Sequence, residues 1–150
     1  MTESNQTSTR PHGLEILEVE WSEHRDKLAE IRFLVFVQEQ NVPQEIELDE
    51  MDAVSRHLLA TIGDKPVGTG RLLPDGHIGR VAVLRACRRQ GIGQALMHDL
   101  VEMGRVAGFS RLLLSAQVSA LTFYRGLGFI EHGDSFMEAG IEHLEMELLL

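Results

Sequence analysis

The stretch from His77 to Leu100 constrains the fold of this chain most strongly, because it joins three local patterns in one continuous run. A short apolar run that ends at Val83 predicts a strand, a basic loop follows, and an amphipathic helix begins near Ile92, just after Gly91. Glycine lets the backbone approach a bound group, and a helix N-terminus presents unpaired N–H groups and the positive end of the helix dipole. The stretch therefore predicts an anion site, with phosphate as the expected ligand.

Two common phosphate-binding motifs do not fit this loop. A Walker loop needs a Lys directly after its last glycine, whereas Gly93 is followed by Gln94 and Ala95. A dinucleotide-binding motif places its first glycine at the end of the strand and an acidic residue about twenty positions later. Here seven residues separate Val83 from Gly91, and the next predicted strand ends without a carboxylate.

The loop instead resembles the pyrophosphate-binding loop of the GNAT superfamily of N-acetyltransferases. That motif, R/Q-x-x-G-x-G/A, matches the run Arg88-Arg89-Gln90-Gly91-Ile92-Gly93, which follows a Val-Ala-Val strand as in the family. The segment from Ser119 to Phe129 is similar to a second GNAT signature, A-x-x-F-Y-x-x-x-G-F, in which Gly128 ends a short helix. The segment from Ile31 to Pro43 looks like the corresponding part of the small bacterial ElaA/YjcF-like branch.

The resemblance covers residues 14–150 and implies a single domain with the GNAT fold. That fold is an α/β (α+β) three-layer α/β/α sandwich with a mixed, mostly antiparallel sheet. The implied reaction is direct transfer of an acetyl group from acetyl-CoA to a primary amine of a small molecule or peptide, within a ternary complex. Tyr124, the only Tyr of the chain, matches the family's general acid, which protonates the leaving thiolate.

The resemblance also implies how the cofactor is held. Backbone N–H groups at the helix start and an arginine bind the pyrophosphate, and the pantetheine arm pairs with the strand before the loop, where a bulge is expected. An N–H near Ala82 or Val83 polarises the thioester carbonyl. The residues assigned to cofactor binding are Val81, Ala82, Val83, Arg88, Arg89, Gln90, Gly91, Ile92, Gly93, Gln94, Gln117 and Phe123.

Two residues depart from the family pattern, Gln117, where the family often has an Asn, and Gly79. Many GNAT proteins carry a Glu on the strand before the loop, as the base that accepts the amine proton, and this chain has Gly79 there. The candidates for a substitute base are His57, Glu39, Glu50 and His77. The missing Glu keeps open a CoA-binding regulatory module without transferase activity. A third alternative is a dimeric interaction domain, and a homodimer fits the enzyme as well.

Other reactive side chains give weaker signals. Cys87 lies among three arginines, which favours a thiolate, but no His is close in sequence to serve a Cys nucleophile. The histidines are too scattered for a metal-site signature, so no metal is predicted.

Length, charge and cysteine content limit the kinds of binding partner and the compartment expected for this chain. A chain of 150 residues predicts one domain, and its net charge of −9 argues against nucleic acid or anionic membranes as partners. The acid-rich stretch from Gln44 to Asp52 is read either as a lip that attracts a cationic amine or as a solvated loop. One Cys, no signal peptide and no long apolar run predict a cytoplasmic protein without an intrachain disulfide.

The remaining elements follow from local patterns. Residues 1–13 are polar and without periodicity, which predicts a disordered tail. Ser22 is the expected N-cap of a helix that buries Leu28, Ile31, Leu34 and Val35. Polar and apolar residues alternate from His143 to Leu148, as in a strand with one face in water. Further strands are expected at Leu14–Val19, Ser55–Ile62, Val67–Leu73 and Leu112–Ala116.

Overall fold

The computed structural model describes residues 10–44 and 48–150. The strands are β1 (Leu14–Val19), β2 (Arg56–Ile62), β3 (Lys65–Leu72), β4 (His77–Val83), β5 (Arg111–Gln117), β6 (Ile130–Glu138) and β7 (Ile141–Leu149). The helical segments are α2 (Trp21–Arg32), the π-helical η1 (Phe33–Glu39), η2 (Glu50–Ala53), η3 (Arg85–Cys87), α4 (Ile92–Val106), η4 (Val118–Ala120) and α5 (Leu121–Gly126).

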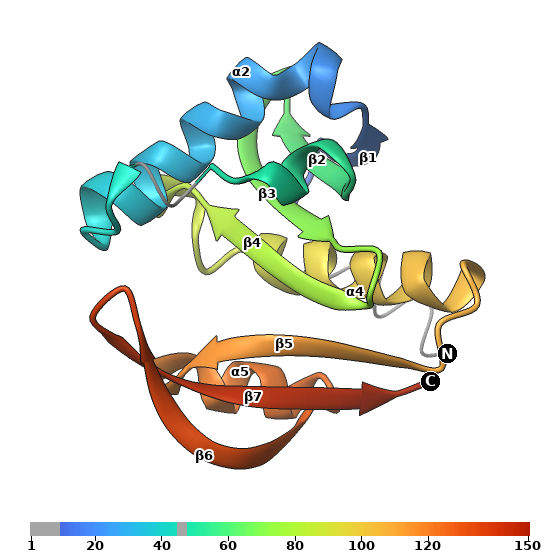
Figure 1. Ribbon diagram of the computed structural model, residues 1–150. Helices are drawn as coiled ribbons and strands as arrows, with labels where there is room; N and C mark the ends of the chain where they lie inside the picture. Colours follow the sequence, from blue (N-terminus) through green and yellow to red (C-terminus); the bar gives the residue numbers. More distant parts are fainter. Residues whose placement is uncertain (1–9, 45–47) are drawn as a thin grey trace.

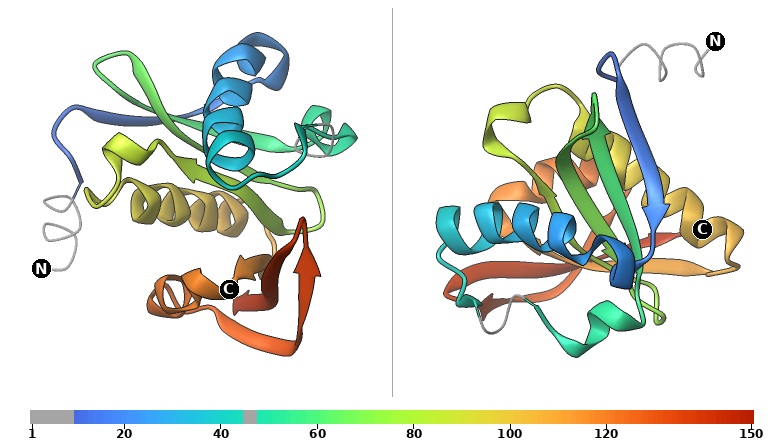
Figure 2. Two further views of the ribbon diagram at one scale, coloured as in Figure 1. Left: turned by 90° about the vertical axis from the view of Figure 1, so that its left-hand side faces the viewer. Right: turned by 90° about the horizontal axis from the view of Figure 1, so that it is seen from above.

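The strands form one mixed sheet in the order β1-β2-β3-β4-β5-β7-β6 (Figure 1). Every neighbouring pair is antiparallel except β4 and β5. Helix α2 covers one face of the sheet, and α4 and α5 pack on the other (Figure 2). The three layers and the mixed, mostly antiparallel sheet confirm the predicted fold class.

The helix that follows the glycine loop packs into the larger of the two core clusters. Its apolar positions recur at helical spacing, and Leu96, Met97 and Leu100 are fully buried against the sheet. On the opposite face, Leu28 and Ile31 of α2 pack in a second cluster of buried side chains. Because α4 is anchored in the core, it holds the glycine loop that precedes it in place.

The predicted start of α2 is wrong by two positions. The N-cap is Glu20 and the helix begins at Trp21, so Ser22 lies within the first turn and caps nothing. The predicted apolar face also shifts, because the chain becomes π-helical from Phe33 onward. As a result Leu34 is partly exposed, at 38% of its maximal surface, instead of buried.

The start of the chain lies partly outside the description. The predicted disordered tail spans residues 1–13, of which residues 1–9 are outside the described residues. The guanidinium of Arg10 lies 2.8 Å from a carboxylate oxygen of Asp99 on α4. Within the described part, no helix is both long and apolar enough to cross a membrane.

In the described sheet, strands β4 and β5 pair with each other over only a short part of their length. They pair at His77–Leu113 and Ile78–Leu114, at the end of the sheet where β4 begins, and then separate. The outer edge of β4 is therefore left without a neighbouring strand from Gly79 onward.

A bulge lies on β4 at the same level. Thr69 pairs with Ala82 and Arg71 pairs with Gly79, so two residues of β4 stand opposite Gly70. One of the two, Arg80, has the left-handed backbone angle φ 52°. The bulge expected from the GNAT resemblance is confirmed.

The alternation on β7 is also confirmed, but its polar face is not in water throughout. His143 pairs with Gln117 of β5 and is 7% exposed. Glu145 pairs with Ser115 on the same face and is part-buried. This face lies beside the separation of β4 and β5, which explains why polar side chains here are enclosed.

Candidate active site

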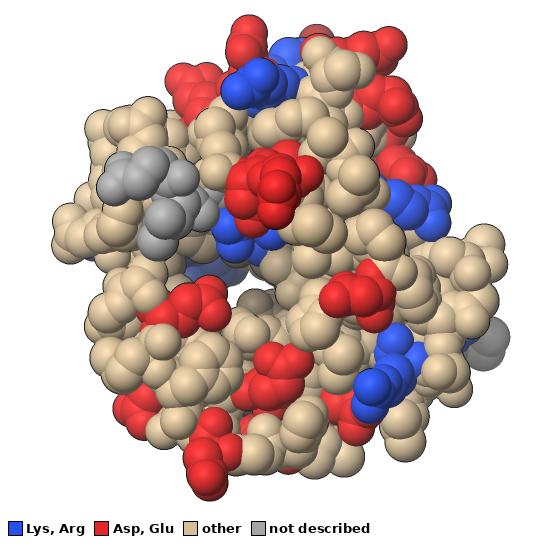
Figure 3. Space-filling model, viewed as in Figure 1, with Lys and Arg blue, Asp and Glu red and all other residues tan. Residues whose placement is uncertain are grey.

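A cleft of about 430 Å³ opens where β4 and β5 separate. Figure 3 shows the surface hollowed there, with basic side chains above the hollow and acidic side chains around it. Side chains from both halves of the sheet meet in this space, together with η1, η4, α5 and the β6–β7 turn. Those that matter for the chemistry are Arg71, His77, Gly79, Val81, Gln117, Tyr124 and His143.

Backbone groups on β4 face this opening. The N–H of Leu84 donates to the carbonyl of Val67 on β3, at 2.9 Å. Because successive residues of a strand direct their backbone groups to opposite edges, Val83 and Val81 present theirs to the edge that β5 leaves uncovered. The predicted contact residue Val81 and the N–H of Val83 therefore face the uncovered edge, whereas the Val83 carbonyl accepts a hydrogen bond from Arg88 and Ala82 is buried beneath α2.

The N-terminus of α4 has the features of an anion site. Gly91 is its N-cap, in the left-handed conformation at φ 87°, and no side chain caps the helix. The first helical hydrogen bond runs from Ala95 N–H to Gly91 O, so the N–H groups of Ile92, Gly93 and Gln94 have no helical acceptor. Since the Ile92 side chain is in the core, only its backbone can serve a ligand.

Phe123 and Val83 lie next to this helix start. A Cβ added at Gly93 would stand 3.8 Å from Phe123 Cζ and 3.9 Å from Val83 Cγ2. Three residues predicted to bind the cofactor are thus neighbours. The glycine keeps the backbone between them uncovered, which fits a group that must approach it closely.

Arg88 is engaged in a way that sequence reasoning missed. Its Nη1 and Nη2 donate to the two carboxylate oxygens of Glu39, each at 2.6 Å, and its Nε donates to the Val83 carbonyl at 3.0 Å. Hydrogen bonds from Arg88 lower the pKa of Glu39, which stays ionised. Of the other predicted loop residues, Arg89 and Gln90 are exposed, and Arg89 has a left-handed φ of 65°. Gln94 is exposed on the first turn of α4.

Tyr124 reaches the cleft from α5. Its ring packs edge-on against Phe123 and Phe129, with centroids 5.1 and 6.2 Å away. Burial raises the pKa of its hydroxyl, so the group remains a proton donor at neutral pH. The helix ends as predicted at Gly128, whose φ of 100° is left-handed.

Gln117 also lines the cleft. Its amide nitrogen donates to the side-chain oxygen of Gln40 at 2.9 Å. The hydrogen bond joins β5 to the segment after η1, across the space between the two halves of the sheet.

The four candidate bases are not equivalent. Burial lowers the pKa of His57, whose ring contacts the Asp52 carbonyl and stacks on Trp21 away from the cleft. Glu39 is held by Arg88, and Glu50 is exposed on η2. These three do not line the cleft.

His77 does line the cleft, but both of its ring nitrogens face carboxylates. Nε2 lies 3.0 Å from Glu145 and Nδ1 lies 3.0 Å from Asp75. Both ring nitrogens are thus already engaged by carboxylates. At Gly79, the family's usual Glu position, a Cβ would meet nothing within 4 Å.

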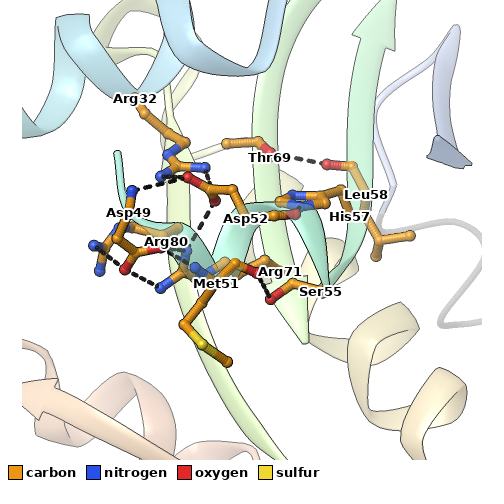
Figure 4. Close-up of polar contacts among 10 residues, drawn as sticks. All are labelled: Arg32, Asp49, Met51, Asp52, Ser55, His57, Leu58, Thr69, Arg71 and Arg80. Carbon is orange, nitrogen blue, oxygen red and sulfur yellow. Dashed lines mark hydrogen bonds and ion pairs between the residues drawn. The ribbon is translucent and has the colours of Figure 1, made fainter. Parts of the chain in front are cut away.

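A cluster of buried ion pairs lies beside the cleft (Figure 4). Asp52, 2% exposed, accepts two hydrogen bonds from Arg32 at 2.8 and 3.1 Å and one from Arg71 at 2.8 Å. Arg71 also donates to Asp49, which pairs with Arg80 at 3.2 Å. Asp52 is thus buried and does not belong to an acidic lip, and Asp49 is bound by arginines. Glu45 and Glu47 of that predicted lip lie outside the described residues.

The sequence reasoning missed Arg71 and His143 as residues of the cleft. For His143 a signal existed, because alternation on β7 places it on one face with Glu145. For Arg71 no such signal existed. A cation within an apolar strand pattern does not show which carboxylates it will pair with until the fold is known.

The family model of the acetyltransferase (GNAT) domain matches residues 22–150. The chain belongs to the GNAT acetyltransferase family. It is 40% identical over 120 residues to the uncharacterized N-acetyltransferase YjcF of Bacillus subtilis, which covers 77% of this chain and 86% of that protein. The GNAT family uses acetyl-CoA, and this chain is a GNAT-type acyltransferase.

Solved GNAT structures agree over nearly the whole fold. The crystal structure of Escherichia coli ElaA has a TM-score of 0.81 and 32% identity, covering 89% of this chain and 99% of that one. An acyl-CoA N-acyltransferase from Pseudomonas aeruginosa has a TM-score of 0.81 and 28% identity, covering 90% and 99%. The similarity to the ElaA/YjcF-like branch is confirmed.

Proposed function

We propose that this GNAT protein is an acetyl-CoA-dependent N-acetyltransferase that acts on a primary amine of a small molecule or peptide. The observation that carries the proposal is the cleft at the β4–β5 separation, where Tyr124 lies in the same space as the uncovered edge of β4. In this proposal the Tyr124 hydroxyl donates a proton beside backbone groups that hold an extended ligand.

The residues fit the cofactor in two places. Unpaired N–H groups at Ile92, Gly93 and Gln94 suit a pyrophosphate, because they combine hydrogen-bond donors with the positive end of the α4 dipole. The open backbone groups of Val81 suit the amides of a pantetheine arm, as an added strand would. Bound acetyl-CoA supplies an activated acyl group.

The protein's contribution to transfer is orientation and proton handling. The Val83 N–H is the donor we assign to the acyl oxygen, where negative charge develops, a role worth about 3 kcal/mol in comparable sites. The Tyr124 hydroxyl donates its proton to the departing sulfur. Because burial raises the pKa of this hydroxyl, it stays protonated until the carbon–sulfur bond breaks.

Calorimetry tests cofactor binding. Titration with acetyl-CoA is expected to give a dissociation constant in the micromolar range or tighter, and Gly91→Val is expected to weaken binding, because the left-handed φ of 87° is strained for a branched side chain. Arg105→Gln, in an exposed pair at the other end of α4, is the matched control. Absence of binding by the wild-type protein contradicts the proposal.

A panel of primary amines monitored for free thiol then tests transfer. Turnover with acetylated product identifies the enzyme. Tight binding without turnover on any amine instead favours a CoA-binding regulatory module. Gly79, at the position where the family often has a base, is the observation that keeps this second function in view.

A further inference from the structure

His143 occupies the cleft at a position suited to proton transfer. It lies on β7 directly opposite Gln117 of β5, and side chains of paired residues point to the same face of the sheet. His143, Gln117 and Tyr124 all line the cleft, so imidazole and phenol border the same space. The side chain is 7% exposed and its ring stacks on Phe136, with centroids 5.9 Å apart.

Hydrogen bonding fixes which nitrogen of His143 is available. Nδ1 lies 2.7 Å from the backbone carbonyl of Ile141, and a carbonyl can only accept, so Nδ1 carries the hydrogen. In the neutral ring, Nε2 then bears the lone pair. Nε2 makes no hydrogen bond to any of the described residues.

The other groups that reach the cleft are less suited. His77 is flanked by carboxylates at both nitrogens. Glu138 lines the cleft at the end of β6, where it is exposed, and it is the competing candidate. Only His143 combines enclosure with a fixed tautomer.

We propose that Nε2 of His143 accepts the proton of the amine during acetyl transfer, in place of the carboxylate absent at Gly79. This inference rests on the proposed function. The amine nitrogen bonds to the acetyl carbon, and the carbon–sulfur bond breaks. The nitrogen's proton passes to Nε2, directly or through water, while the sulfur takes the proton of Tyr124. Imidazolium and phenolate then return to their resting states by exchange with solvent.

Several charged or titratable groups surround this imidazole. Tyr124 comes from α5, and Gln117 and Ser115 of β5 are uncharged neighbours on the same face. On β6 the partner residue is Phe136, which is apolar, with Glu138 two residues further. The remaining ionisable groups are Glu142 and Glu145 on β7 itself and Arg71, His77 and Arg80 across the cleft.

The tautomer can be tested without turnover. Long-range proton–nitrogen NMR of the imidazole rings, with the His143 signals assigned by their loss in His143→Asn, is expected to show hydrogen on Nδ1 at neutral pH. Hydrogen on Nε2 overturns the proposal whether or not an acceptor amine is known.

Kinetics test the role itself. Asn keeps a donor near the Nδ1 position and lacks Nε2, so His143→Asn is expected to lower kcat/KM by about 10²-fold or more, a range typical of general bases. It should also remove the acid limb of the pH profile, in which the rate falls as imidazole becomes protonated. Acetyl-CoA binding by calorimetry should stay within about threefold of wild type, since a role confined to packing would disturb both.

Other outcomes separate the alternatives. His98→Asn, on the exposed face of α4, is the matched control. A His143→Asn protein that keeps its rate, or loses rate with the acid limb intact, overturns the assignment of His143 alone. Loss of the acid limb in Glu138→Gln but not in His143→Asn does the same. A wild-type protein that binds acetyl-CoA and acetylates no amine overturns both this assignment and the proposed function.

Discussion

Arg88 and Glu39 form a two-point ion pair, with both guanidinium–carboxylate distances at 2.6 Å, between the glycine loop and the π-helical η1. The pair neutralises one of the two arginines that the sequence assigns to pyrophosphate. Arg89, the other of the two, is exposed and forms no ion pair with the described residues.

We therefore expect Arg89→Gln to weaken acetyl-CoA binding by about tenfold, the equivalent of one hydrogen bond to a charged group at about 1.5 kcal/mol. Arg88→Gln should weaken it less. Glu39→Gln should strengthen it by about threefold, because an exposed pair contributes only ~0.2–1 kcal/mol and its loss releases the Arg88 charge. Titration calorimetry at two salt concentrations checks the order, and a larger effect at Arg88 than at Arg89 contradicts it.

Tyr124→Phe is expected to lower kcat by about tenfold to a hundredfold, since a positioned acid assists a thiolate that is already a fair leaving group. Acetyl-CoA affinity should not change. Because burial raises the pKa of Tyr124 above its ordinary 10.0, deprotonation of this group should cause no loss of wild-type rate between pH 7 and 9. A basic limb below pH 9 that disappears in Tyr124→Phe would contradict the assignment.

Asp52→Asn should destabilise the fold by about 3–5 kcal/mol, because it leaves Arg32 and Arg71 as buried cations without their shared carboxylate. Urea unfolding at pH 7 measures the loss, with Asp64→Asn in the exposed β2–β3 turn as the control.

The same carboxylate predicts a pH dependence. Burial alone would raise the pKa of Asp52, but hydrogen bonds and the charge of Arg32 outweigh burial and lower it. A lowered folded-state pKa means that the stabilisation is complete above the unfolded-state value and is lost as pH falls through the folded-state one. Wild-type stability should therefore decline below about pH 4, and Asp52→Asn should show a shallower decline over the same range.

Substitution by Ala should affect stability differently at two glycines on neighbouring strands. A Cβ at Gly79 meets nothing within 4 Å, so Gly79→Ala should leave the melting temperature unchanged within about 1 °C. A Cβ at Gly70, opposite the bulge, would stand 2.8 Å from Leu100 Cδ1, and Gly70→Ala should cost about 1–3 kcal/mol. Equal melting temperatures for the two variants would show that α4 yields at Leu100.

The sequence was most informative where function and local geometry coincide. The glycine loop, the start of α4 at Ile92 and the left-handed Gly128 could be predicted because each depends on a few adjacent residues. The bulge at Arg80 came from the family resemblance, since nothing in the local pattern requires it.

The polar part of the site was harder to predict. Partners such as Arg88 and Glu39 are 49 positions apart, and Arg71 and Asp52 are 19 apart, so only the fold brings them together. The acidic stretch was read as a surface feature, yet Asp52 is among the most buried residues. Charge patterns in sequence do not distinguish water from an arginine as the partner of a carboxylate.

In the described sheet, two residue pairs, His77–Leu113 and Ile78–Leu114, are the register contacts between β4 and β5. Because these strands share so short a junction, we expect the angle between the two halves of the sheet to change easily. The His77–Glu145 hydrogen bond connects β4 to β7 across this junction. We therefore expect this side-chain contact to influence the width of the cleft without touching a bound ligand.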